Sequence, residues 1–155
     1  MLPAGGSCLL GSINLAEFVK NPFTKNAEFD FEDFKYTVKE SIVALNEVLD
    51  EGLALHPLQE QRDSVNDWRQ VGAGIMGLAD MLIKLGITYG SQEAIELCDK
   101  IGWIMANYSI KSSARLAKEY GAFPKCNIGE IINTEYFCNN TDDRTRDLVI
   151  TYGLR

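Results

Sequence analysis

The sequence predicts a mainly α-helical chain with one or two short strands. Two observations indicate this class: apolar residues recur at spacings of three and four along most of the sequence, and the alternation typical of strands is confined to two short stretches. The chain has 155 residues, of which 46% are hydrophobic and 10% aromatic, which is enough for one compact core. Because it contains no internal repeat, linker or low-complexity tract, we expect residues 1–155 to form a single segment.

The first helix is expected between Asp30 and Gly52. Asp30 is a suitable N-cap, and Glu32 and Asp33 place negative charge in the first helical turn, where the helix dipole favours it. Apolar residues then follow at helical spacing and define one buried face, formed by Phe31, Phe34, Val38, Ile42, Leu45 and Leu49. Gly52 is a suitable stop, so the helix is predicted to end there.

Two short helices are expected next. His56 precedes a proline, which marks a boundary, and Pro57 can open a helix that continues to about Trp68. Residues 77–85 carry another apolar helical face, and Gly86 is expected to stop this helix.

The longest helix is expected from its N-cap Ser91 to Tyr120, with Gly102 as the position of a bend. Its predicted buried face is formed by Ile95, Cys98, Ile101, Met105 and Tyr108. Residues 128–140 are expected to be irregular, with at most a short helical turn. Thr141 is then expected to begin the last helix, which Gly153 terminates.

Strand signals are weak, and the best candidates are residues 7–10 and 69–71. The two ends of the chain are unusual. Residues 1–10 are rich in glycine and apolar residues but contain no capping residue, and residues 152–155 stop where a connection to a further element should follow. We therefore expect the chain to be an excised piece of a larger domain.

The charge balance argues against a nucleic-acid-binding module. The chain carries 15 basic and 22 acidic residues, a formal net charge of −7, and no stripe of lysine or arginine. Duplex binding depends largely on basic side chains that neutralise phosphates. The apolar runs are far shorter than the roughly 20 residues of a membrane span, and no secretion signal opens the chain. We expect neither a nucleic acid nor a membrane as partner.

Four cysteines are present, Cys8, Cys98, Cys126 and Cys138. Their spacing matches no zinc motif, and so few cysteines in a chain this long do not fit a disulfide-stabilised secreted domain. A cytoplasmic protein without a metal site is therefore expected. Cys98 lies at helical spacing among apolar residues, which favours core packing, and Cys126 and Cys138 are expected to be structural or exposed thiols. Cys8 differs, because the glycines before it allow a partner to approach the sulfur closely.

Residues 72–77, Gly-Ala-Gly-Ile-Met-Gly, match the glycine pattern of dinucleotide-binding loops. That function requires a buried strand before the loop and an acidic residue after a second strand, about 20 positions further on. Only Val71 is β-branched among the preceding residues, and Glu93 lies in a helix start. We interpret the glycines instead as a tight strand-to-helix turn with close packing. His56 has no acidic or nucleophilic motif beside it and is interpreted as a boundary residue rather than a catalytic base.

Three blocks of the sequence resemble the large, catalytic subunit of ribonucleotide reductases. Residues 8–15, Cys-Leu-Leu-Gly-Ser-Ile-Asn-Leu, resemble the family signature C-N-L-G-S-I-N-L, with Leu9 in place of the asparagine. Residues 68–80 are similar to the family's R-x-I-G-L-G-I-M-G-L-A-D block, and residues 114–124 to its L-A-x-E-x-G-x-F-P stretch. The blocks occur in the family's order.

The resemblance implies a ten-stranded α/β barrel in the parent enzyme, to which this chain contributes strands and outer helices. It also implies thiyl-radical chemistry that reduces ribonucleotides to the deoxyribonucleotides needed for DNA synthesis and repair. In that chemistry a pair of cysteines is oxidised to a disulfide as the ribose 2′-hydroxyl leaves, and Cys8 matches the second cysteine of the pair. The radical cysteine, the first cysteine of the pair and the phosphate site have no counterpart in this sequence, so the isolated chain is expected to be inactive.

The residues that precede Cys8, Leu-Pro-Ala-Gly-Gly-Ser, are most similar to the class II branch, which implies adenosylcobalamin in the parent enzyme. A class I enzyme with a di-iron partner subunit is the alternative. The implied partners are a ribonucleotide substrate, nucleotide effectors and a thioredoxin-like reductant, and excision would expose apolar surface that allows self-association. A different class of function also stays open, that of a stand-alone acidic helical interaction module without catalysis. A Rossmann-type oxidoreductase is not expected, because residues 72–77 lack the preceding buried strand and the following acidic residue that a dinucleotide site requires.

Overall fold

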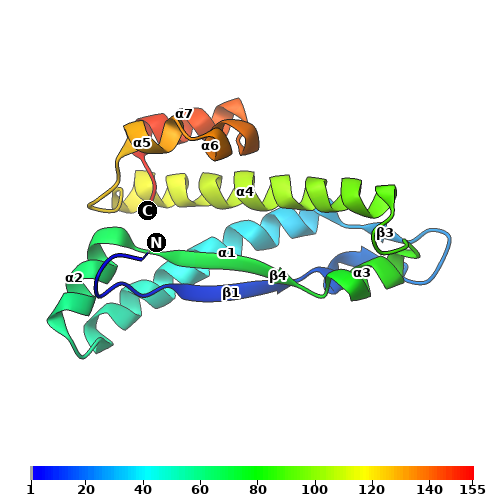
Figure 1. Ribbon diagram of the computed structural model, residues 1–155, viewed down its shortest axis with the longest axis horizontal. Coiled ribbons are helices and arrows are strands. Elements are labelled where there is room, and N and C mark those ends of the chain that lie inside the picture. Colours follow the sequence, from blue (N-terminus) through cyan, green and yellow to red (C-terminus); the bar gives the residue numbers. More distant parts are fainter. Residues whose placement is uncertain (1) are drawn as a thin grey trace.

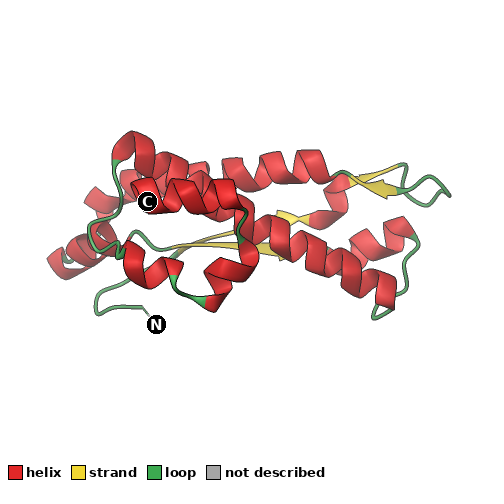
Figure 2. Cartoon of the chain, turned by 90° about the horizontal axis from the view of Figure 1, so that it is seen from above, coloured by secondary structure: helices red, strands yellow, loops and turns green. Residues whose placement is uncertain are grey.

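The computed structural model describes residues 2–155, and within this range it is mainly helical, as the sequence predicts (Figure 1). The strands are β1 (Leu9–Asn14), β2 (Val19–Lys20), β3 (Glu28–Phe29) and β4 (Val71–Met76). The helices are α1 (Phe31–Gly52), α2 (Gln59–Trp68), α3 (Leu78–Leu85), α4 (Gln92–Tyr120), α5 (Ile128–Ile132), α6 (Glu135–Asn140) and α7 (Asp143–Tyr152). Two short 3₁₀ turns, η1 (Leu15–Phe18) and η2 (Leu53–Leu55), are also present. Figure 2 shows the short strands lying among much longer helices.

The two longest helices begin where their capping residues predict. The Asp30 carboxylate accepts hydrogen bonds from the backbone amides of Glu32 and Asp33, both at 3.2 Å, and α1 follows. The Ser91 hydroxyl accepts one from the amide of Ala94 at 3.2 Å, and α4 follows. Each cap satisfies amide groups that have no partner inside the helix.

Strands β1 and β4 form a parallel pair in register from Leu9 opposite Val71 to Asn14 opposite Met76. A parallel pair needs a long crossover between its strands, and α1 is the main element of that crossover (Figure 1). Within residues 2–155 no third strand joins this sheet, and β2 and β3 form a separate antiparallel pair. The β1–β4 pair is therefore the central sheet of the described chain.

The main core lies where η1, α1, α3 and α4 meet. The ring of Phe34 contacts the rings of Phe18 and Phe29 edge-on, with centroids 5.3 and 5.5 Å apart, in the arrangement that aromatic pairs prefer. A second, smaller cluster lies between α4, α6 and α7 and contains Ala114, Phe137 and Val149. Helix α4 contributes to both clusters, so it connects the two ends of the molecule.

The strands are longer than the sequence suggests. The prediction placed them at residues 7–10 and 69–71, whereas β1 extends to Asn14 and β4 to Met76. Gly72 and Gly74 therefore lie inside a strand, and only Gly77 forms the turn into α3. The full length of β1 and β4 was not predicted because a parallel strand is stabilised by a partner far away in the chain, which local residue preferences do not reveal. The small antiparallel pair of β2 and β3 was not predicted either.

The helices also differ in detail from the prediction. The first short helix begins at Gln59 rather than Pro57, and residues 128–140, expected to be irregular, form α5 and α6. The last helix is capped by Asp142, so Thr141 precedes the helix instead of beginning it. Ile95, expected on the buried face of α4, is 49% exposed within this chain.

Helix α4 has 29 residues, but neither it nor any other helix in the described range is apolar enough over sufficient length to cross a membrane.

Candidate functional site

Cys8 lies immediately before β1, on the face of the sheet that α1 does not cover. Side chains alternate between the two faces of a strand. A side chain at Gly11 would come within 3.5 Å of Leu45 on α1, so that position faces the helix. Leu10 points the other way and is 80% exposed. The Cys8 sulfur lies 3.5 Å from the place where a Cβ on Gly72 would stand, which puts the half-buried thiol on the open face between the two strands.

The peptide around Cys8 is fixed on both sides. Before it, Gly5 has a φ of 67°, and a Cβ there would come within 2.8 Å of Cγ of Glu60, so the segment packs directly on α2. After it, the amide of Leu9 donates a hydrogen bond to the carbonyl of Gln70 at 3.3 Å. The thiol is thus held by α2 and by the start of β4.

His56 lines the same cavity as Cys8, although the two residues are far apart in the sequence. The cavity has a volume of about 210 Å³ and is lined by Ser7, Cys8, Leu9, Val48, Leu49, Gly52, His56, Val65 and Gln70. His56 has extended backbone after η2, as expected of a boundary residue, and its carbonyl accepts a hydrogen bond from Nε of Arg62 at 2.7 Å. This proximity could not be predicted from local sequence, because the crossover through α1 is needed to bring the two residues together.

The glycine motif does not form a dinucleotide loop. Its first five residues lie in β4, where their backbone groups belong to the sheet instead of surrounding a phosphate. Gly77 follows with a φ of 70°, and a Cβ there would collide with Oδ1 of Asn14. Close packing is therefore the role of the last glycine, in agreement with the sequence interpretation.

The other cysteines lie elsewhere. Cys98 is half-buried and lines an apolar cavity between β4 and α4, which agrees with the packing role expected for it. The Cys126 sulfur accepts a hydrogen bond from the amide of Leu154 at 3.5 Å, and Cys138 is exposed. All four thiols are free in the part of the chain that the structure describes, and no three potential metal ligands of the His, Cys, Asp or Glu type cluster there.

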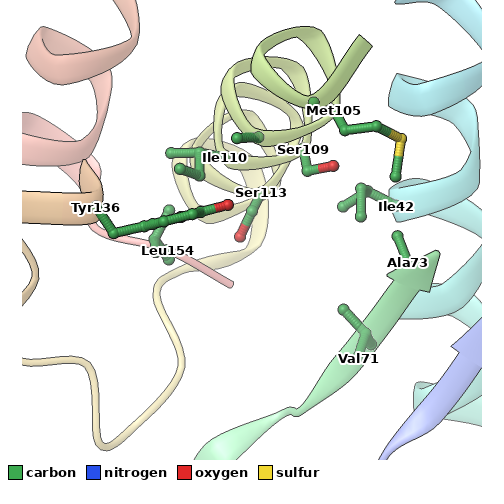
Figure 3. A pocket seen from close by; sticks show the side chains of 11 residues that line it. Ile42, Val71, Ala73, Met105, Ser109, Ile110, Ser113, Tyr136 and Leu154 are labelled. Atoms are coloured by element: carbon green, nitrogen blue, oxygen red, sulfur yellow. The ribbon is translucent and has the colours of Figure 1, made fainter. Parts of the chain in front are cut away.

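A larger cavity of about 320 Å³ lies between β4, α4 and the C-terminal residues (Figure 3). Figure 3 shows Tyr136 reaching toward Leu154 from one side, while Val71 and Ala73 of β4 form the other side. The polar side chains on its wall are Ser109, Ser113 and Tyr136. Because the lining contains no carboxylate, imidazole or thiol, this cavity offers no acid–base pair.

A buried arginine holds the start of β4, and sequence reasoning did not find it. Arg69 is 6% exposed and has a φ of 44°; it donates hydrogen bonds to Asp50 at 2.7 Å and to Asn46 at 2.6 Å. Arg155 approaches the same carboxylate at 3.5 Å. The hydrogen bond from Arg69 is the main reason why the pKa of Asp50 is lower than usual. The network thus attaches α1 to Arg69, the residue before Gln70. The Gln70 carbonyl in turn accepts a hydrogen bond from the amide of Leu9, which follows Cys8.

Two parallel strands joined by a helical crossover are the repeating unit of α/β barrels, and the thiol lies at the beginning of the first strand. The comparison with protein families identifies the barrel. Residues 3–147 match the model of the ribonucleotide reductase barrel domain, and the chain belongs to this family.

Curated relatives agree with this assignment. The chain is 40% identical over 116 residues to the ribonucleoside-diphosphate reductase subunit alpha of Chlamydia pneumoniae, a match that covers 75% of this chain and 10% of that protein. It is 38% identical over 118 residues to the vitamin B12-dependent ribonucleoside-diphosphate reductase of Thermoplasma acidophilum, a match that covers 76% of this chain and 15% of that protein. The ribonucleoside-diphosphate reductase large chain of Encephalitozoon cuniculi is 36% identical over 111 residues, a match that covers 72% of this chain and 14% of that protein. The chain thus spans only about a tenth to a seventh of the length of these relatives.

Proposed function

We propose that this chain contributes the redox-active thiol of Cys8 to an enzyme that reduces ribonucleotides to deoxyribonucleotides. The observation that supports the proposal most directly is the position of the sulfur, on the uncovered face of a parallel strand pair in a chain of the ribonucleotide reductase family. Relatives are named as ribonucleoside-diphosphate reductases, which supports a ribonucleoside phosphate as the substrate class.

The proposed role of Cys8 agrees with the electron balance. Replacement of a ribose 2′-hydroxyl by hydrogen, with release of water, consumes two electrons and two protons. Two thiols supply both when they close to a disulfide, so Cys8 and a second cysteine of the full-length subunit each lose one hydrogen and form the S–S bond. A thioredoxin-like dithiol then reduces this disulfide by exchange and restores the Cys8 thiol. Such exchange requires access to the sulfur, and Cys8 is half-buried within this chain.

For the parent enzyme we propose adenosylcobalamin as cofactor, with a di-iron partner subunit as the alternative. The name of the Thermoplasma relative supports the first option, and that of the Chlamydia relative states no cofactor. The cavity that Cys8 and His56 line with α1 does not fit a corrinoid, because its volume of about 210 Å³ is smaller than the roughly 300–1,000 Å³ typical of pockets for drug-sized ligands. The cofactor would therefore be held by other parts of the enzyme, and we assign no residue of this chain to it.

We further propose a reducing, cytoplasmic setting, consistent with four free thiols, and nucleotide effectors that act on the complete subunit. Leu10 and Met76 are exposed on the same face as Cys8, so self-association of the chain by itself would use this face. Nothing in the described structure favours the stand-alone interaction module over the reductase.

The test is the substitution Cys8→Ser in the full-length enzyme, assayed for deoxyribonucleotide formation with a dithiol as reductant. We expect multiple turnover to be abolished, because serine cannot form the disulfide. The matched control is Cys138→Ser, which changes an exposed cysteine of another part of the chain and is expected to leave turnover unchanged. Undiminished multiple turnover by Cys8→Ser would contradict the proposed role.

A further inference from the structure

The outer edge of β4 is unpaired in the described part of the chain. One edge of β4 pairs with β1, and within residues 2–155 no strand joins the other edge. In the same range no backbone group of residues 71–76 bonds to the backbone of another element outside the sheet. In a parallel pair only some of the N–H and C=O groups of each strand point to the neighbour, and the others point to the opposite edge. This edge can therefore pair with one more strand.

An apolar groove follows this edge between β4 and α4. The cavity of Figure 3 has a volume of about 320 Å³, and a second cavity of about 320 Å³ adjoins it, because Ala73, Gly102 and Met105 line both. Val71 at the start of β4 lines the first cavity and Ile75 near its end lines the second. No charged side chain lines either cavity. We call the two cavities together the β4–α4 groove.

The exposure of Ile75 indicates that the groove is an incomplete part of the core. Ile75 lies opposite Ile13 of β1, so the two side chains point to the same face of the sheet. Ile13 is 7% exposed and belongs to the main core, whereas Ile75 is 44% exposed. The difference arises on the unpaired side of β4, where the groove lies. A side chain placed in the groove would remove this apolar surface from water.

The wall that α4 contributes is made of small residues. Gly102, Ala106, Ser109 and Ser113 line the groove at spacings of four, three and four, which places them on one side of the helix. Nothing lies within 4 Å of a Cβ built at Gly102. Facing layers pack closely when small side chains on one meet large side chains on the other. The element that fits this groove therefore presents large apolar side chains to α4.

The last described residues lead the chain to the Val71 end of the groove. Leu154 lines the groove together with Val71. The amide of Arg155 donates a hydrogen bond to Oγ of Ser113 at 3.0 Å, and its carbonyl accepts one from this hydroxyl at 2.9 Å. The relatives are several times longer than this chain, so chain outside residues 1–155 is available. A segment that enters from Arg155 passes Val71 before Ile75 and thus runs parallel to β4.

We propose that an extended segment of the full-length subunit, outside residues 1–155, fills the β4–α4 groove as a strand parallel to β4. At alternate positions it turns large uncharged side chains toward the small residues of α4, as the period of a strand requires. A barrel leaves no sheet edge unpaired, but membership of the barrel family states neither the direction of this segment nor the size of the side chains that α4 receives. The proposal does not depend on the redox role of Cys8.

The direct test is photo-crosslinking in the full-length subunit. An amino acid with a diazirine side chain replaces Gly102 in one variant and Ser109 in the other, and mass spectrometry identifies the residues that they reach. The two positions are about 10 Å apart along α4, which corresponds to about three residues of a strand. Helix α4 runs antiparallel to β4 (Figure 1). We therefore expect both probes to reach one segment outside residues 1–155, with the residue reached from position 109 about three positions before the one reached from position 102.

The control carries the same amino acid in place of Glu96, which is exposed and lines neither cavity, and it should not reach that segment. The opposite order of the crosslinked residues would overturn the proposed direction. A separation of about seven positions would indicate a helix instead of a strand. Crosslinks to a second copy, recognised by mixing subunits with light and heavy isotopes, or no crosslink outside residues 1–155 would overturn the proposal as a whole.

A pair of substitutions tests the filling of the groove independently. Alanine and leucine are both good helix formers, so Gly102→Ala and Gly102→Leu differ mainly in the volume that they place in the groove. If a strand fills the groove, leucine must displace its side chains, and Gly102→Leu in the full-length subunit should melt at least about 3 °C below Gly102→Ala. Glu96→Leu and Glu96→Ala are the matched control pair and should melt within about 1 °C of each other. Equal melting temperatures in the Gly102 pair would show that the groove is empty and overturn the proposal.

Discussion

Gly77 shows how one residue fixes the relation between a strand and the helix that follows it. Its φ of 70° turns the chain from β4 into α3, and a side chain there would collide with Asn14 at the end of β1. Asn14 cannot move freely, because its Oδ1 accepts a hydrogen bond from the amide of Ala16 at 3.2 Å and so caps η1. The position therefore excludes other residues for two reasons, the left-handed backbone and the neighbouring amide group.

We predict that Gly77→Ala destabilises the protein by about 2 to 3 kcal/mol, the sum of left-handed strain and partial loss of the Asn14 cap. Gly86→Ala is the control, because Gly86 has a φ of 74° but nothing within 4 Å of an added Cβ, so it should cost only about 1 kcal/mol. Urea unfolding measures the loss of stability in both variants. In an Asn14→Ala background the cost of Gly77→Ala should fall to that of Gly86→Ala, and an unchanged cost would show that Asn14 is not the obstacle.

At the level of whole elements, helix α7 depends on its N-cap. The Asp142 carboxylate accepts hydrogen bonds from the Thr145 amide at 2.7 Å and, across to α4, from Asn107 at 3.0 Å and Lys111 at 3.2 Å. Burial by itself would raise the pKa of Asp142, but these hydrogen bonds outweigh it and hold the pKa well below its usual value. One carboxylate thus both starts α7 and attaches it to α4.

The lowered pKa predicts how the stabilisation by Asp142 depends on pH. Because the folded protein binds this proton less readily than the unfolded chain, the stabilisation is complete above the ordinary pKa of 3.8 and is lost as the pH falls below it. Asp142→Asn keeps a capping side chain but removes the charge opposite Lys111, so we expect it to cost about 1 kcal/mol at pH 7.

The measurement is the difference in unfolding free energy between the parent and Asp142→Asn, followed from pH 7 down to pH 3. This difference should shrink below about pH 3.8. Asp143→Asn, one residue further on and almost fully exposed, is the control and should change stability by less than about 0.5 kcal/mol. A difference that stays constant with pH would contradict the assignment.

The helices were largely predictable because their signals are local. Asp30 and Ser91 are followed within four residues by the amides that they cap, and the apolar stripe of α1 can be read from its own sequence. The strands were not, because β1 and β4 are parallel and each depends on a partner about 60 residues away. Helices α5 and α6 were missed because they are short and contribute few residues to any apolar stripe.

For the molecule as a whole, Asp50 joins three distant parts of the chain. It belongs to α1, it binds Arg69 at the start of β4, and it lies 3.5 Å from Arg155 near the C-terminus. The Arg69 side chain is only 4% exposed, so its positive charge depends on this carboxylate and on Asn46. Loss of the negative charge would leave a cation in a place that water hardly reaches.

We predict that Asp50→Asn destabilises the protein by about 1 to 2 kcal/mol, a modest value because the Asp50 side chain is itself 42% exposed and the amide oxygen can still accept a hydrogen bond. Glu51→Gln on the next position of α1 is the control and should lie within about 0.5 kcal/mol of the parent. Thermal or urea unfolding distinguishes them, and equal effects of the two substitutions would mean that the arginine network contributes nothing specific.

The candidate site was predictable only in part. Cys8 was singled out from its glycine-rich surroundings and from the family resemblance, and the redox role itself stays a prediction. Its neighbours could not be foreseen: Gly72 was interpreted as part of a turn, His56 as a boundary residue only, and Arg69 was not considered. Gly72 comes close to the Cys8 sulfur through the pairing of β1 with β4, and His56 lines the same cavity as Cys8. Arg69 stands directly before Gln70, which also lines that cavity.

The parallel pairing also sets an order of events during protein synthesis. Leu9 is made before its partner Val71, which follows 62 residues later (71 − 9), a delay of roughly 3 to 12 s at about 5–20 residues per second. Until then the thiol of Cys8 sits on a nascent chain without the strand that flanks it. The strand that flanks this sulfur is therefore complete only after residue 76 has been made.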